Sequence, residues 1–211
     1  MRSPDTILWC VDAQKDFMLP GGKLYVPKAE KLLPNIGRLV DVARDGRAFL
    51  VSHGCFHIAD DPEFKTFPPH CVKGTAGADF VPEALCEDYV RVLNEPGSSL
   101  PEDFLRNQQI ILEKQTLDIF ESRHANALLE RLDRNARFVV FGVVTEYCVR
   151  FAAKGLLERN RKVCVVNDAI ETLSREAGER TISELATLGA NFVTTNEALT
   201  RLAATAGGGD F

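Results

Sequence analysis

The feature that most constrains the fold is a regular alternation of short apolar runs with helical patterns. Seven runs rich in β-branched and aromatic residues have the length of strands: Ile7–Val11, Ala48–Ser52, Tyr89–Leu93, Gln109–Leu112, Phe138–Phe141, Lys162–Val166 and Asn191–Thr194. Helical spacing of apolar residues separates several of them, over Glu30–Asp45, His124–Asp133, Thr145–Arg159 and Arg175–Leu188. Strands that alternate with helices form βαβ units, whose parallel strands are covered on both faces. The pattern predicts an α/β fold, a three-layer α/β/α sandwich around a mainly parallel central sheet of Rossmann-type topology.

The chain has the size of one domain. Its 211 residues show no internal linker, so we expect a single domain over residues 1–202 and a flexible tail over 203–211. Gly46, Asn160 and Gly189 each follow a helical pattern and suit the left-handed position that ends a helix. Two of the six cysteines lie inside strand-like runs, and a chain of this size needs no disulfides, so we expect reduced thiols.

Charge and hydropathy restrict the partners. The net charge of −5 disfavours binding to nucleic acid or to an anionic membrane. No apolar stretch approaches the length of a transmembrane helix, and the N-terminal run 7–11 is too short for a secretion signal. The sequence therefore predicts a cytoplasmic protein without a membrane or nucleic-acid partner.

Several chemically active side chains follow the strand-like runs. Ligands of open parallel sheets bind beyond the carboxyl ends of the strands. The residues at those ends are Asp12, Cys55, His57, Lys114 and Cys148. They supply an acid, a cation, a nucleophile and metal ligands, which favours an active site over simple packing.

Cys148 occupies a favourable place for a nucleophile. It lies early in the helical pattern that follows the run Phe138–Phe141, and Thr145 is a suitable N-cap. Amide N–H groups at a helix start stabilise a thiolate and so lower the cysteine pKa. The alternative is that Cys148 is a small buried residue that packs the helix onto the sheet.

Four motifs occur in order along the chain. They are Asp12–Phe17 (DAQKDF), Phe67–Thr75 (FPPHCVKGT), Glu113-Lys114, and Gly142–Val149 (GVVTEYCV). On these motifs the chain resembles the isochorismatase-like cysteine hydrolases, the group that includes nicotinamidases and carbamoyl amidases. The resemblance implies a homodimer or homotetramer that acts on a small-molecule amide without an organic cofactor.

The resemblance also implies a catalytic triad of Asp12, Lys114 and Cys148. A carboxylate beside a thiol can take its proton, and a nearby ammonium keeps the carboxylate ionised. The thiolate attacks a carbonyl carbon, and the resemblance assigns the oxyanion to the backbone amides of Val144 and Cys148, with a cis peptide between Val143 and Val144. The implied activity is hydrolysis of a C–N bond in an amide, ureido or carbamoyl substrate through a thioester.

Many members of this group bind a divalent metal, often zinc. By resemblance the ligands here are His57, His70 and, in place of the usual aspartate, Cys55. A thiolate in that position favours zinc over magnesium or manganese. Two alternatives stay open: the site binds no metal and Cys55 lines the pocket, or His53 acts as a ligand in a shifted loop register.

Two aromatic residues are candidates for the substrate pocket. Phe17 and Phe67 are expected as its walls, and Phe67 stands where nicotinamidases usually have tryptophan. The alternative for each is core packing. For the whole protein, the alternative function is a non-catalytic small-molecule-binding or scaffold protein on the same fold.

Overall fold

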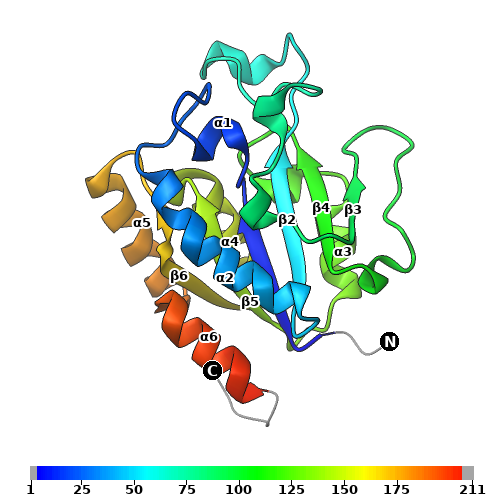
Figure 1. Cartoon of the computed structure of the whole chain (residues 1–211), viewed down its shortest axis with the longest axis vertical. Helices are drawn as coiled ribbons and strands as arrows, with labels where there is room; N and C mark the ends of the chain where they lie inside the picture. The colour runs from blue at the N-terminus through cyan, green and yellow to red at the C-terminus, as the bar shows by residue number, and fades with distance from the viewer. Residues whose placement is uncertain (1–3, 206–211) are drawn as a thin grey trace.

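The computed structural model describes residues 4–205, and these form one seven-stranded sheet in which all neighbouring strands run parallel. The strands are β1 (Thr6–Val11), β2 (Phe49–Cys55), β3 (Tyr89–Val92), β4 (Gln109–Lys114), β5 (Arg137–Val143), β6 (Lys162–Glu171) and β7 (Asn191–Val193). Their order across the sheet is β3-β4-β2-β1-β5-β6-β7 (Figure 1). All seven predicted strands are confirmed.

Helices cover both faces of the sheet, as predicted. They are α1 (Lys15–Met18), α2 (Leu33–Arg44), α3 (Ala125–Arg131), α4 (Arg150–Glu158), α5 (Arg175–Thr187) and α6 (Thr195–Thr205). The apolar residues of α2 and α6 join one buried cluster, and those of α3, α4 and α5 join the other. Figure 1 shows α2 and α6 in front of the sheet with α3 and α4 behind it. The molecule is therefore a three-layer α/β/α sandwich.

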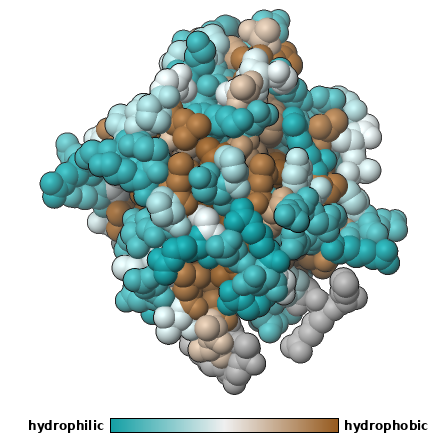
Figure 2. Space-filling model, viewed as in Figure 1, coloured by the Kyte–Doolittle hydropathy of each residue, from teal (hydrophilic) through white to brown (hydrophobic). Residues whose placement is uncertain are grey.

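The central strand β1 shows why this arrangement is stable. All six of its side chains are buried; Leu8 and Cys10 face one cluster, and Trp9 and Val11 face the other. Alternating side chains of a strand point to opposite faces, so a strand covered on both sides is apolar throughout. Hydrophilic side chains cover most of the outer surface in the view of Figure 2, with apolar residues in small patches between them.

The helix ends agree with the sequence in part. Gly46, Asn160 and Gly189 have φ values of 71°, 56° and 102°, which confirms them as left-handed helix ends. The helix α6 was not predicted, and it includes residues 203–205 of the expected flexible tail. The rest of that tail lies outside the described residues. Within residues 4–205, no helix has both the length and the apolar character needed to span a membrane.

The strand order predicts a ligand site at the carboxyl edge of β1. Beyond β1 the chain continues to β2 on one side and later to β5 on the other, and ligands of such sheets bind where the order reverses. β2 and β4 are longer than predicted and end at Cys55 and Lys114, which are paired in register. The polar candidates thus meet at one edge.

Candidate active site

Asp12 lies directly beyond β1 in a left-handed conformation. Its φ is 48°, a conformation that few residues other than glycine adopt, although aspartate tolerates it better than most. The backbone N–H of Asp12 donates to the carbonyl of His53 at 3.0 Å, which fixes the turn against β2. Asp12 is only 1% exposed.

Lys114 connects the candidate triad. Its fully buried Nζ lies 3.0 Å from Oδ2 of Asp12, 2.9 Å from Sγ of Cys55 and 3.5 Å from Sγ of Cys148. Burial alone would lower the pKa of Lys114, but Asp12, Cys148 and Cys55 together outweigh it and raise this pKa well above its usual value. Burial likewise opposes ionisation of Asp12, yet the Lys114 ammonium and the nearby His53 side chain lower its pKa to about 2. The two groups therefore form a buried ion pair.

Cys148 lies in a π-turn, not in the first turn of an α-helix. The π-turn spans Thr145–Val149, contains the non-helical residue Tyr147 (φ −118°, ψ −106°), and precedes α4. Val144, not Thr145, is the N-cap, since the hydroxyl of Thr145 donates to the carbonyl of Glu171 at 2.8 Å. The predicted N-cap is therefore wrong. The peptide bond between Val143 and Val144 is cis, as the resemblance implies.

The expectation of a lowered Cys148 pKa is also wrong. Burial and the neighbouring Asp12 carboxylate raise the pKa of this thiol well above its usual value, and the Lys114 ammonium opposes them only in part. A buried thiol has lost the water that would stabilise its anion. Cys148 therefore rests as a neutral thiol, and a base must take its proton before it can attack.

A second group of buried side chains lies beside the triad. One ligand atom each from Cys55, His57 and His70 lies within 4.8 Å of the others. Nδ1 of His57 lies 3.0 Å from Oδ2 of Asp61, and Nδ1 of His70 lies 2.8 Å from the carbonyl oxygen of Pro68. A carboxylate or a backbone carbonyl beside a ligand histidine is usual at metal sites, because it orients the imidazole ring. The arrangement fits a zinc ion bound by one sulfur and two nitrogens.

His53 does not belong to this second group. Its Nδ1 lies 3.6 Å from Oδ1 of Asp12, and the side chain is fully buried. The alternative in which His53 replaces Cys55 as a metal ligand is therefore not what the structure shows. The sequence analysis missed its contact with Asp12.

Two residues of the first motif hold the loops of the site, and the sequence analysis missed both. The side-chain amide of Gln14 donates to the carbonyls of Cys55 (2.7 Å) and Ala78 (2.8 Å) and accepts from the N–H of Cys55 (2.7 Å). Asp16 accepts hydrogen bonds from the backbone N–H groups of Lys23 (3.0 Å) and Cys71 (2.7 Å). Their positions two and four residues after Asp12 were the available signal.

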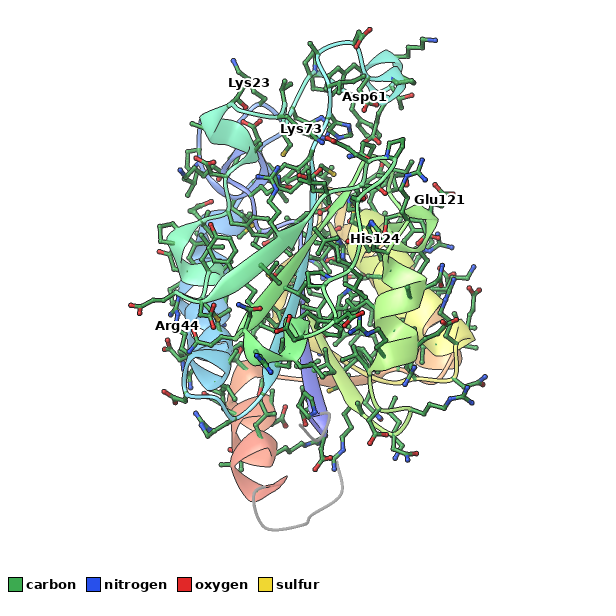
Figure 3. All side chains as sticks on the ribbon, turned by 90° about the vertical axis from the view of Figure 1, so that its right-hand side faces the viewer. Lys23, Arg44, Asp61, Lys73, Glu121 and His124 are labelled. Carbon is green, nitrogen blue, oxygen red and sulfur yellow. The ribbon has the colours of Figure 1, made fainter. Side chains whose placement is uncertain are left out.

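The loop that carries His70 is tied to the segment that follows β2 and to β4. The N–H of His57 donates to the carbonyl of Cys71 at 3.1 Å, and the N–H of Lys73 donates to the carbonyl of His57 at 2.9 Å. The ammonium of Lys73 lies 2.8 Å from Oε2 of the buried Glu113 on β4. Figure 3 shows Lys73 and Asp61 at the same end of the molecule.

The two predicted pocket residues both lie against His70. The ring centroids of Phe17 and Phe67 are 5.2 Å and 6.5 Å from that of His70. Phe67 also packs edge-on against Tyr147, the residue before Cys148, at 6.1 Å. Phe67 therefore contacts both His70 and the residue before the nucleophile, whereas Phe17 contacts His70 from within the buried core.

The comparisons with known proteins agree with this geometry. The sequence matches the Isochorismatase domain family over residues 92–197. Nicotinamidase of Saccharomyces cerevisiae is 27% identical over 78% of this chain and 87% of its own length, and nicotinamidase of Escherichia coli is 27% identical over 78% and 82%. The crystal structure of pyrazinamidase of Pyrococcus horikoshii in complex with zinc superposes with a TM-score of 0.72 and 28% identity, over 90% of this chain and 99% of that one. This protein belongs to the isochorismatase family.

Proposed function

We propose that this protein is a cysteine hydrolase that cleaves the C–N bond of a small amide, ureido or carbamoyl substrate. The observation that carries the proposal is the contact of one buried ammonium, that of Lys114, with both the Asp12 carboxylate and the Cys148 sulfur. Asp12 and Lys114 fill the two auxiliary roles that an inert thiol needs, a proton acceptor and a charge that stabilises the anion. The two nicotinamidase relatives support a small amide as the substrate class.

The first half of the reaction forms a thioester. Asp12 takes the proton of Cys148, and the thiolate attacks the carbonyl carbon of the substrate while Lys114 remains beside both groups. The backbone N–H groups of Val144 and Cys148 donate to the oxyanion, the type of contact that contributes most to acyl transfer. The C–N bond then breaks, and the leaving nitrogen receives the proton from Asp12 as ammonia or an amine departs.

The second half regenerates the thiol. A water molecule gives its proton to Asp12 and attacks the thioester carbon. The C–S bond breaks, the carboxylic or carbamic acid product leaves, and the proton held by Asp12 returns to the sulfur of Cys148. Atoms and charges balance over the cycle, and no organic cofactor takes part.

The proposal includes a divalent metal, with zinc preferred, bound by Cys55, His57 and His70. Nδ1 of His57 lies against the Asp61 carboxylate at 3.0 Å, whereas Nε2 has no hydrogen-bond partner within residues 4–205 and is the nitrogen left to bind an ion. Cys55 remains a suitable ligand although Lys114 contacts it, because a metal-bound thiolate still accepts a hydrogen bond. When bound, the metal would act as a Lewis acid that orients and polarises the substrate.

The test is ammonia release from a panel of primary amides and N-carbamoyl compounds. We expect turnover of at least one compound by the wild-type protein and none by Cys148→Ala with an unchanged circular dichroism spectrum. Mass spectrometry of the acid-quenched reaction should find an acyl group on the peptide that contains Cys148. Absence of turnover across the panel, together with unchanged binding of the same compounds by Cys148→Ala, would instead support a small-molecule-binding protein.

A further inference from the structure

The two oxygens of the Asp12 carboxylate have different surroundings. Oδ2 faces the working side of the site, where Nζ of Lys114 lies at 3.0 Å and Sγ of Cys55 at 4.0 Å. Oδ1 faces the other way, toward Nδ1 of His53 at 3.6 Å. Neither side chain is more than 1% exposed, so water does not solvate either group from outside.

Oδ1 and the His53 ring are polar atoms that have no other partner. Within residues 4–205, no hydrogen bond of normal length reaches Oδ1 of Asp12, Nδ1 of His53 or Nε2 of His53. Buried polar groups in native proteins are nearly always hydrogen-bonded, because an unmet donor or acceptor loses its water without compensation. The gap of 3.6 Å exceeds a normal N–H···O distance by only a few tenths of an ångström, which a small rotation of either side chain closes.

The backbone holds His53 in this place. His53 on β2 pairs with Val11 in register, and its carbonyl accepts the N–H of Asp12 at 3.0 Å. The His53 ring lies near the indole of Trp9, at a centroid distance of 6.0 Å. A histidine in such an apolar position is unexpected unless its nitrogen serves a specific acceptor.

We propose that His53 is a positioning residue, which donates a hydrogen bond from Nδ1 to Oδ1 of Asp12 and so aims Oδ2 at Lys114 and Cys148. The inference rests on the proposed function, in which Asp12 accepts the proton of Cys148. The torsion that turns a carboxylate is soft and has no sharp minima, so a base with one free oxygen can rotate away from its proton donor. A displacement of about 1 Å in such a group can slow a reaction about a hundredfold.

Three substitutions at residue 53 separate this role from packing. His53→Asn keeps an N–H donor where Nδ1 is, His53→Gln moves the donor to the place of Nε2, and His53→Phe keeps the ring volume without a donor. The first readout is the rate at which iodoacetamide alkylates Cys148 at one fixed pH, followed on the Cys148 peptide by mass spectrometry. The second readout is kcat and KM on any amide that the wild-type protein hydrolyses.

We expect alkylation and kcat to fall roughly tenfold or more in His53→Gln and His53→Phe, with KM within about twofold, and His53→Asn to recover most of the loss. Thermal unfolding should not follow this order, because phenylalanine suits the apolar neighbourhood at least as well as asparagine. Equal rates in all variants, or an Asn variant as slow as the Phe variant, would overturn the proposal. Alkylation needs no substrate, so the order of the alkylation rates tests the role of His53 even if no amide is hydrolysed. Failure to hydrolyse any amide would count against the proposed function alone.

Discussion

The ammonium of Lys114 reaches across an intervening strand to lie 3.0 Å from the carboxylate of Asp12. Lys114 ends β4 and Asp12 follows β1, while β2 runs between them and ends at Cys55. The lysine side chain therefore passes over Cys55, whose sulfur lies 2.9 Å from Nζ. This crossing brings the triad and the predicted metal ligand Cys55 into one connected group.

The Asp12–Lys114 pair should contribute to stability as well as to chemistry. Removal of one partner from a buried ion pair leaves the other charge without compensation, at a cost of about 3–5 kcal/mol. We expect Lys114→Met to lower the free energy of unfolding in urea by about this amount and to abolish hydrolysis. The double variant Asp12→Asn, Lys114→Met should regain part of the stability but none of the activity.

The matched control for this prediction is Lys154→Met. Lys154 on α4 has a side chain that is 36% exposed, and it lies 3.8 Å from Glu158. Exposed pairs contribute between zero and about 1 kcal/mol, so little change is expected. Equal losses of unfolding free energy in Lys114→Met and Lys154→Met would show that the buried ion pair stabilises the fold no more than an exposed one.

The lowered pKa of Asp12 predicts a specific dependence of stability on pH. A carboxyl group whose pKa falls from 3.8 to about 2 on folding stabilises the native state above the unfolded pKa and loses that contribution as the pH drops through 2. The contribution is about 2 kcal/mol at neutral pH, and about half of it is lost by pH 3. In chelated protein, the difference in unfolding free energy between wild type and Asp12→Asn should therefore shrink by about 1 kcal/mol between pH 6 and pH 3. A difference that stays constant would mean that Asp12 is not held ionised by Lys114.

Local sequence patterns predict the strands, because each is a short apolar run that needs cover on both faces. The same patterns place Asp12, Lys114 and Cys148 at one edge. The start of α6 was also readable: Thr194 and Glu197 form a capping box, in which the Glu197 carboxylate accepts from the Thr194 N–H at 2.7 Å.

Properties that depend on residues distant in the chain could not be predicted from local sequence patterns. The pKa of Cys148 is set by burial and by Asp12, which lies far away in sequence, so the local helix pattern predicted the wrong direction. The contact of His53 with Asp12 could not be predicted either, because the two residues come together only through the pairing of β1 with β2.

The identity of the ligand at residue 55 should decide which metal binds. Thiolate favours zinc, whereas carboxylate suits harder ions such as manganese. We expect elemental analysis of purified protein to find zinc near one equivalent in the wild type, little metal in Cys55→Ala, and in Cys55→Asp restored metal with a higher share of manganese when both ions are supplied. His53→Phe is the control and should keep its zinc, because His53 faces Asp12. Equal zinc contents in wild type and Cys55→Ala would exclude the thiolate as a ligand.

A glycine outside the triad should control the loop that carries His70. A Cβ on Gly77 would lie 2.2 Å from the carboxylate of Asp16, which accepts the N–H of Cys71 at 2.7 Å. Gly77→Ala must therefore displace Asp16 and loosen the backbone next to His70, at a cost of about 1–3 kcal/mol. We expect lower stability in urea and weaker zinc binding in a competition assay with a chelator. Gly37→Ala is the matched control. Gly37 lies inside α2, and its Cβ would lie 3.8 Å from Glu83, an ordinary contact distance. This variant should gain about 0.5–1 kcal/mol of unfolding free energy and bind zinc normally. If Gly77→Ala loses stability but binds zinc as tightly as wild type, then Asp16 supports the fold without positioning His70.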